Sequence, residues 1–299
     1  MKKSVGILGT GDMGSAIARC LGSEGYQVHT CLDGRSERSR YLATNAKMKD
    51  TESLEELMSR IDIMLSVMPP DEATKFAETI CPQIYKSKRD ILFVDCNAVA
   101  PATAARNATI ADQHTVRFQD AGIVGAAPSP GGLPVRIYTS GPWCSELDEL
   151  SSEMISIKPL GEDIGQASAL KMVYASLTKG TNALRVAALM AGEQLGIGAQ
   201  VREEWAYSLP EVYKAMESRV PDLASDSARW VTEMQEIADT YSSVGLTSAF
   251  HNGAEEIYRL LSTTDLAAES REEARQSGRT TEETLHFFIE ALNRPEPSN

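Results

Sequence analysis

The sequence predicts an α/β domain with a doubly wound, mostly parallel sheet, followed by an all-α domain that a long helix joins to it. Three observations carry this prediction. Short apolar segments alternate with helical segments up to about residue 160, which is typical of parallel sheets. A stretch without proline then runs over residues 165–195, far beyond the mean helix length of about 11–12 residues. The periodic segments that follow are all helical. We therefore expect domains at residues 1–164 and 165–293, and a disordered tail at 294–299.

The amino-acid composition limits the classes of protein to which the chain can belong. The chain has 299 residues, 42% apolar and 24% charged, as in soluble globular proteins. No apolar run approaches the roughly 20 residues that span a bilayer. The net charge of −13 argues against nucleic acid and anionic membranes as partners. The 5 cysteines and 4 histidines are scattered without metal-ligand or disulfide spacing, so we expect reduced thiols, no metal and a cytoplasmic location.

A glycine motif follows the first apolar segment. Residues 4–8 (SVGIL) are expected to form a strand, and a helical pattern and a second strand at 26–32 come after the motif. The motif itself reads Gly9-Thr10-Gly11-Asp12-Met13-Gly14. Alone, G-x-G-x-x-G is weak evidence, but between a strand and a helix it is the dinucleotide fingerprint of a Rossmann domain. Its glycines permit the tight turn, the approach of the pyrophosphate and close helix packing, and the helix N-terminus attracts the phosphates.

The end of the second strand bears on the choice of cofactor. Asp33 is suited to the ribose 2′-hydroxyl of NAD(H). Arg35, Ser36 and Arg38 offer donors suited to the 2′-phosphate of NADP(H). Counting donors favours NADP(H), with NAD(H) possible. The alternative is an ordinary solvated loop before a helix.

The alternation then continues toward the second domain. Helices are expected at 54–59, 71–80, from 101 and at 145–153, with strands at 61–68, 90–95, 135–140 and 155–158 and a loop at 128–134. Ligands of doubly wound sheets lie beyond the carboxyl ends of the strands. That rule places Met68, Pro69 and Asn97 beside the nicotinamide. In the all-α part, helices are expected at 201–207, 211–218, 224–241, 248–261 and 281–291.

The long helix has two faces at 100° per residue. Val173, Leu177, Leu184, Ala187 and Ala191 fall on one side, and the other arc holds Lys171, Tyr174, Thr178, Asn182 and Arg185. Lys171 is either an ordinary exposed lysine or, if the helix bridges two domains, a group in the cleft between them. Trp230 and Met234, one turn apart, either face that cleft or pack in the core.

Five fragments, GTGDMG, VMPP, VDCNAVAP, DAGIVGAAP and GQASALK, occur in the order and spacing of the β-hydroxyacid dehydrogenases. That superfamily includes 3-hydroxyisobutyrate and 6-phosphogluconate dehydrogenases. The chain looks still closer to a branch of NAD(P)-dependent oxidoreductases with a 6-phosphogluconate-dehydrogenase-like C-terminal domain. The resemblance covers nearly the whole chain and implies a Rossmann domain, a long interdomain helix and a helical domain that forms a homodimer.

The resemblance also implies roles for single residues. The catalytic lysine of the family maps onto Lys171, and Asn97 and Tyr174 are secondary catalytic candidates. The substrate-binding segment maps onto residues 120–126, which nominates Asp120, Gly122, Ile123, Val124 and Gly125. In two places the chain departs from the family: a serine is replaced by Val124, and an asparagine by Ala175. Both changes suggest a less polar substrate pocket.

The leading hypothesis is hydride transfer between nicotinamide and a small or medium-sized hydroxy or keto substrate, with Lys171 as general acid/base. Such a role requires its pKa to fall from about 10.4 toward ~7–8. One alternative is an imine reductase using NADPH, although such enzymes usually carry aspartate or tyrosine where this chain has Lys171. Another is a non-catalytic cofactor-binding protein.

Overall fold

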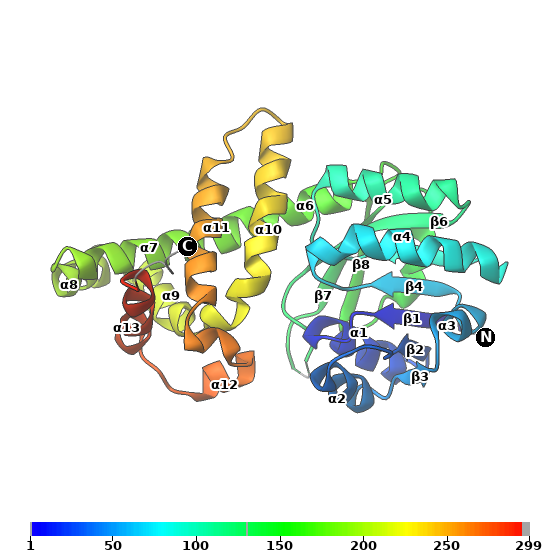
Figure 1. Ribbon diagram of the computed structural model, residues 1–299, viewed down its shortest axis with the longest axis horizontal. Helices are drawn as coiled ribbons and strands as arrows, with labels where there is room; N and C mark the ends of the chain where they lie inside the picture. The colour runs from blue at the N-terminus through cyan, green and yellow to red at the C-terminus, as the bar shows by residue number, and fades with distance from the viewer. Residues whose placement is uncertain (1, 130, 295–299) are drawn as a thin grey trace. The chain divides into compact units, whose positions relative to one another are not determined.

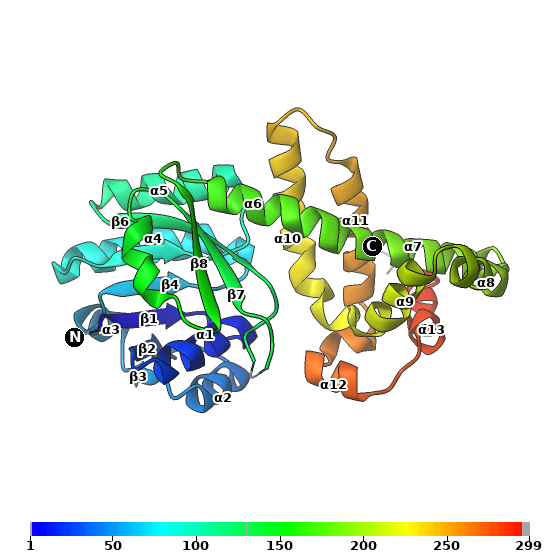
Figure 2. The ribbon, with the colours of Figure 1, turned by 180° about the vertical axis from the view of Figure 1, so that it is seen from behind.

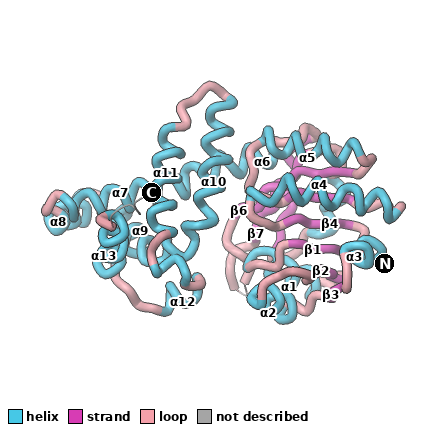
Figure 3. The backbone as a smooth tube through the Cα atoms, in the orientation of Figure 1, coloured by secondary structure: helices cyan, strands magenta, loops and turns pink. Residues whose placement is uncertain are grey.

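The computed structural model describes residues 2–129 and 131–294. The chain divides into two units, residues 1–174 and 175–299. Figure 3 shows all the strands in the first unit, while helices and loops make up the described part of the second. The predicted fold class, a doubly wound α/β domain followed by an all-α region, is therefore confirmed. Of the tail expected to be disordered, everything after Arg294 lies outside the described residues.

The first unit is built on an eight-stranded sheet with the order β3-β2-β1-β4-β5-β6-β7-β8 (Figure 1). The strands are β1 Ser4–Leu8, β2 Gln27–Cys31, β3 Lys49–Thr51, β4 Ile63–Ser66, β5 Leu92–Asp95, β6 Arg117–Val124, β7 Val135–Ser140 and β8 Ile155–Gly161. Neighbours from β3 to β6 are parallel, β6 and β7 are antiparallel, and β7 and β8 are again parallel. The strand order reverses beside β1, as it does in nucleotide-binding sheets.

Helices cover both faces of this sheet (Figure 2). They are α1 Asp12–Ser23, α2 Glu37–Asn45, α3 Leu54–Arg60, α4 Pro70–Ser87, α5 Pro101–Gln113, the 3-10 helix η1 Cys144–Leu150 and α6 Gln166–Ala175. Alternate strand residues pack against opposite layers. Val5 and Ile7 join the core under α1, α2 and η1. Leu8 and Phe93 join the core under α3, α4 and α5.

The helical unit consists of α7 Thr181–Gln194, α8 Gly198–Ser208, α9 Pro210–Arg219, α10 Ala224–Ser243, α11 Ala249–Ser262, α12 Arg271–Gln276 and α13 Thr281–Leu292. Helices α10 and α11 lie side by side (Figures 1 and 2). The rings of Trp230 and Tyr258 hold them together in an edge-to-face contact, with centroids 5.1 Å apart. A buried ion pair between Lys179 and Glu233 adds to this core.

The long helix departs from the expected regular periodicity. A π-helical turn, η2 Ser176–Gly180, separates α6 from α7. One wide turn shifts the faces that follow it, so the arcs assigned at 100° per residue do not continue across it. The apolar arc is also not buried, because Val173 is 56%, Leu177 74% and Leu184 70% exposed.

Candidate active site

The glycine loop after β1 has the geometry that a dinucleotide requires. Gly9 has φ +100°, and a Cβ there would lie 2.0 Å from the Val67 carbonyl oxygen. A Cβ on Gly14 would lie 2.2 Å from the Gly9 carbonyl oxygen, so neither position tolerates a side chain. Gly11 precedes α1 in extended conformation, and nothing lies within 4 Å of the place where its Cβ would be. A phosphate can therefore approach the backbone at Gly11.

Two further observations fit a ligand at this loop. Thr10 is 3% exposed, and its hydroxyl has no hydrogen-bond partner among the described residues. A buried hydroxyl without a partner costs about 1–3 kcal/mol, which a bound phosphate would recover. Asp12 opens α1, and Met13 packs against the core of the α/β unit. Together with the space at Gly11, these residues fit a nicotinamide dinucleotide.

The candidate residues for the adenosine ribose follow β2. Asp33, Arg35 and Arg38 are exposed, and Arg38 forms an ion pair with Asp12 at 2.8 Å. Ser36 caps α2 by accepting a hydrogen bond from the Ser39 backbone N–H. The Asp12–Arg38 pair links the two loops that would hold the adenosine half of the cofactor.

The ends of β4 and β5 are joined by one buried amide. Asn97 is 2% exposed; its Oδ1 accepts from the Met68 backbone N–H at 2.7 Å, and its Nδ2 donates to Ser66 Oγ at 2.9 Å. The amide thus fixes the segment leading to Pro69, the exposed residue before α4. In this structure Asn97 shapes the loop expected beside the nicotinamide.

Lys171 lies on helix α6, directly over strand β6. A Cβ on Gly122 would lie 3.0 Å from Lys171 Cβ and 2.6 Å from the Ala167 carbonyl oxygen, so the helix packs closely because Gly122 has no side chain. The Lys171 ammonium donates to the Ile123 carbonyl at 2.7 Å. Its side chain is thereby held at the carboxyl end of β6, on the sheet edge where the glycine loop also lies.

Strand register supports this placement. Leu8, Ser66, Asp95 and Asp120 form one row across β1, β4, β5 and β6. The glycine loop, Met68, Asn97 and Ile123 all follow this row on their own strands, so they share one edge of the sheet. Three strand spacings, about 14 Å, separate β1 from β6.

Both carboxylate oxygens of Asp120 accept hydrogen bonds, and three of the four donors belong to the start of helix α6 or the residue before it. It is 1% exposed; Oδ2 accepts from the backbone N–H groups of Gly165 and Ser168, each at 3.0 Å, and from Ser140 Oγ at 2.9 Å. Oδ1 accepts from Ser168 Oγ at 2.7 Å. A carboxylate at a helix N-terminus satisfies unpaired N–H groups and the helix dipole. The residue nominated for substrate thus anchors the helix that carries Lys171.

The other nominated residues lie in different surroundings. Val124 is buried, whereas Gly125 is exposed with φ +121°. Tyr174 is 43% exposed. In the helical unit Trp230 is 4% and Met234 0% exposed. Of the two alternatives for this pair, facing a cleft or packing in the core, this burial corresponds to the second.

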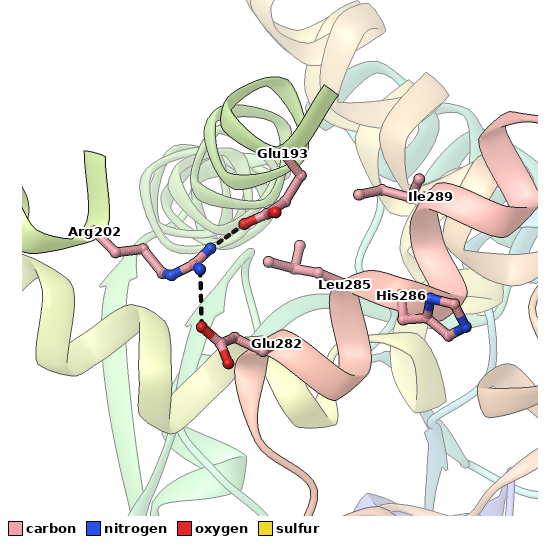
Figure 4. Close-up of a pocket in the computed structure, with 6 residues that line it drawn as sticks. All are labelled: Glu193, Arg202, Glu282, Leu285, His286 and Ile289. Atoms are coloured by element: carbon pink, nitrogen blue, oxygen red, sulfur yellow. Dashed lines mark hydrogen bonds and ion pairs between the residues drawn. The ribbon is translucent and has the colours of Figure 1, made fainter. Parts of the chain in front are cut away.

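Figure 4 shows a cavity of about 370 Å³ in the helical unit. It is lined by Glu193, Arg202, Glu282, Leu285, His286 and Ile289. Arg202 pairs with both Glu193 and Glu282, so two carboxylates share its one positive charge. None of the nominated residues lines this cavity. Within residues 2–129 and 131–294, no three His, Cys, Asp or Glu side chains gather where a metal could bind.

Three residues of the site were not nominated from the sequence. Ser140 and Ser168 complete the shell around Asp120, and Ser66 orients Asn97. Ser168 stands three residues after Gly165, so a capping pattern could have found it. Ser66 and Ser140 are brought in by strand pairing and carry no local signal.

Comparison with known proteins agrees with this geometry. Residues 4–141 match the family described as the NAD binding domain of 6-phosphogluconate dehydrogenase, and residues 193–261 match a domain of unknown function. The conserved protein MTH1747, described as similar in structure to 3-hydroxyacid dehydrogenases, is 27% identical, with a TM-score of 0.63 over 92% of this chain and 99% of its own.

Two more distant structures share the fold. The 3-hydroxyisobutyrate dehydrogenase of Mycobacterium tuberculosis is 16% identical, with a TM-score of 0.67 over 93% of this chain and 100% of its own. The imine reductase of Myxococcus stipitatus, in complex with NADP⁺, is 17% identical, with a TM-score of 0.54 over 96% of this chain and 99% of its own.

The fold and the glycine loop define the class: an NAD(P)-dependent oxidoreductase. The order of the two matched domains, first the NAD-binding domain and then the domain of unknown function, points to one group within this class. In its matched domains and its fold the chain is similar to the β-hydroxyacid dehydrogenases, the superfamily that its motifs resemble.

Proposed function

We propose that the protein interconverts a hydroxyl and a carbonyl group of a small or medium-sized substrate, with Lys171 as general acid/base. The observation that carries the proposal is the position of Lys171, whose ammonium is fixed at the Ile123 carbonyl on the cofactor edge of the sheet. Bound NAD(P)(H) supplies or accepts the hydride. In reduction the Lys171 ammonium donates a proton to the carbonyl oxygen, and in oxidation the neutral amine takes the hydroxyl proton.

Other residues of the α/β unit have supporting roles in this proposal. The loop from Gly9 to Gly14 binds the pyrophosphate. Asn97 sets the segment at Met68 and Pro69 against the nicotinamide, and Tyr174 is a secondary proton-transfer group. The buried Val124 and Ala175 make the surroundings of the substrate less polar than a serine and an asparagine would.

The preferred cofactor in this proposal is NADP(H). The exposed guanidinium groups of Arg35 and Arg38 are suited to a 2′-phosphate, since guanidinium binds phosphate through paired hydrogen bonds. Asp33 would instead favour the free ribose of NAD(H). Titrating NADPH and NADH side by side measures this preference.

The test of the catalytic role is Lys171→Met, assayed with NADPH and NADH on a panel of ketones, β-hydroxy acids and cyclic imines. General acid/base catalysis is worth about 10²–10⁴-fold, so a loss of that size is expected without a change in cofactor affinity. The matched control is Lys75→Met on α4, whose side chain is 71% exposed. Activity of Lys171→Met within about tenfold of wild type contradicts the role.

The same panel separates the alternatives. Turnover of cyclic imines but not ketones would favour an imine reductase, which shares this fold. Cofactor binding without turnover of any compound would favour a non-catalytic protein. The Lys171 side chain at the cofactor edge supports carbonyl chemistry.

A homodimer through the helical unit and a cytoplasmic location complete the proposal. Large apolar side chains are exposed on α7 and beyond it, among them Leu184, Leu195 and Tyr207 at 70%, 72% and 86%. A second copy of the chain would bury these side chains in the proposed dimer. All five cysteines are free thiols, as in reducing compartments. None of the described helices is both long and apolar enough to cross a membrane. Analytical ultracentrifugation of wild type and Leu184→Glu tests the dimer.

A further inference from the structure

A buried carboxyl group stands at the end of strand β5. Asp95 is 1% exposed; its Oδ1 accepts from the Asn97 backbone N–H at 3.0 Å, and its Oδ2 accepts from Asn107 Nδ2 at 2.8 Å. Asn107 lies on α5 and is 0% exposed. Its Oδ1 accepts from Thr74 Oγ1, on α4, at 2.9 Å. Asp95 therefore joins the turn after β5 to two helices that cover the same face of the sheet.

The hydrogen bond to Oδ1 determines the course of the backbone after β5. A side-chain oxygen that accepts from the N–H two residues later forms an Asx turn, which restricts the backbone between the two groups. This turn brings the Asn97 side chain toward β4, where its amide accepts from the Met68 backbone N–H and donates to Ser66 Oγ. Asp95 thus acts on the segment at Met68 through a single intermediate, Asn97.

A carboxyl group is costly at this position. Burial, with a smaller contribution from the Asp120 carboxylate on the neighbouring strand, raises the pKa of Asp95 to about 6. In many buried sites an apolar side chain of similar volume is at least as stable as a polar group together with its partners. The hydrogen bonds that Asp95 accepts, rather than its packing, therefore explain why a carboxyl group occupies this site.

We propose that Asp95 is a positioning residue for the cofactor: its carboxyl group fixes Asn97, and Asn97 fixes the segment at Met68 against the nicotinamide ring. Asp95 is buried and acts only through Asn97, so it is not a catalytic residue. The inference rests on the proposed function, in which this segment lies beside the ring, and it names the group that holds the segment there. All the residues involved belong to the α/β unit.

Binding measurements test this role without turnover. NADPH is compared with 2′-phospho-ADP-ribose, which lacks the nicotinamide ring, and NADH with ADP-ribose. Asp95→Ala removes the hydrogen bond that holds Asn97, so affinity for the complete cofactor is expected to fall roughly five- to tenfold. Affinity for the compound without the ring is expected to stay unchanged. Equal losses for both compounds, no loss for either, or a wild type that binds both equally overturns the proposal.

Conservative variants separate positioning from a general loss of structure. Asp95→Asn keeps an oxygen for the Asn97 N–H, and the Asn107 amide can turn over so that its oxygen faces the new amide. This variant is expected to keep the wild-type affinity for the complete cofactor. Asp95→Ser retains a weaker turn of the same kind, so its loss is expected to be smaller than that of Asp95→Ala, and it replaces that variant if alanine does not fold. An Asp95→Asn variant that binds the complete cofactor as weakly as Asp95→Ser overturns the proposal.

The matched control lies at the far end of the same network. Thr74→Val removes the hydrogen bond between α4 and Asn107 but leaves the Asp95–Asn97 bond in place. It is expected to lower stability to urea without changing affinity for either compound. A loss of affinity for the complete cofactor as large as that of Asp95→Ser would show that general loosening is sufficient, and would overturn the proposal.

A double-mutant cycle shows whether Asp95 acts through Asn97. Asn97→Ala is expected to lower affinity for the complete cofactor by at least as much as Asp95→Ala. Adding the Asp95 substitution to Asn97→Ala is expected to cause no further loss, because residues that act in series are not additive. Additive losses overturn the proposal.

The two proposals fail in different ways. If Lys171→Met keeps its activity, the acid/base role fails, while the binding comparison still decides the role of Asp95. If Lys171→Met is inactive and Asp95→Ala weakens both compounds equally, only the positioning role fails.

Discussion

Replacing Gly122 by alanine is expected to reduce catalysis far more than it reduces folding. The added Cβ would lie 2.6 Å from the Ala167 carbonyl oxygen, whereas ordinary contacts begin at 3.4 Å. The backbone of α6 therefore has to retreat by 0.8 Å, the difference between these two distances. The ammonium of Lys171 moves with it, because a Cβ on residue 122 also crowds the Lys171 Cβ at 3.0 Å.

The magnitudes follow from two separate effects. Overpacking of this kind costs about 1–3 kcal/mol of stability. A misplacement near 1 Å can cost about 10²-fold in rate, so kcat is expected to fall by that factor while the variant remains folded. The assays are kcat on the best compound of the panel, NADPH affinity by fluorescence, and the midpoint of urea unfolding. NADPH affinity should not change, since the glycine loop lies three strands away.

Gly22→Ala on α1 is the matched control. Nothing lies within 4 Å of a Cβ at Gly22, and its backbone is helical, so the change is expected to stabilise the protein by about 0.5–1 kcal/mol without affecting kcat. Gly122→Ala with lowered stability and a kcat within about threefold of wild type would refute the dependence of catalysis on the position of Lys171.

Two further changes test other parts of the site. Arg38→Ala is expected to weaken NADPH binding by about 10–100-fold, because it removes a charge-assisted hydrogen bond, and to leave NADH binding unchanged. Equal losses of affinity for both cofactors would contradict a contact between Arg38 and the 2′-phosphate. Burial raises the pKa of Asp95 from 3.8 to about 6, so its contribution to stability is fully present below pH 3.8 and is lost as the pH rises through 6. A shift of 2.2 units, from 3.8 to 6, corresponds to about 3 kcal/mol. Urea unfolding from about pH 4 to 7 should therefore show the wild type losing stability relative to Asp95→Asn, and a difference that does not vary with pH would contradict the raised pKa.

The fold could be predicted because its signals are local. The strands at residues 4–8 and 135–140 coincide with β1 and β7, since each is an apolar segment bounded by turn residues. The edge strand Lys49–Thr51 has no apolar signal, because two of its three residues are exposed. The helix expected to end at residue 80 continues as α4 to Ser87. It contains Pro82, and proline usually breaks a helix, so the expected end was too early.

Other departures arise from tertiary contacts. The helix expected at 145–153 is the 3-10 helix η1 at Cys144–Leu150, and the short α12 was not predicted. The π-helical turn inside the long helix cannot be read from periodicity, although Thr178 and Gly180 within it are weak helix formers.

For the site, the glycine loop was predictable and the roles of polar side chains were less so. The sequence places Asp120 in a segment nominated for substrate, but its partners Gly165 and Ser168 lie 45 and 48 residues away. Ser176 and His251 are 75 residues apart and meet only through helix packing. A sequence reveals which groups can donate or accept hydrogen bonds, whereas the fold decides which of them are already occupied.

The antiparallel pairing of β6 and β7 has a consequence for the direction of the chain. In a parallel sheet each strand ends at the carboxyl edge, and the helix after it runs back toward the amino edge. Here β7 and β8 both run toward the amino edge, so α6 starts at Asp120 and advances with β6 until Lys171 reaches Ile123. Because of this one reversal, α6 runs toward the carboxyl edge of the sheet instead of back toward the amino edge. The side chain of Lys171, in the middle of α6, therefore lies at the edge that also carries the glycine loop.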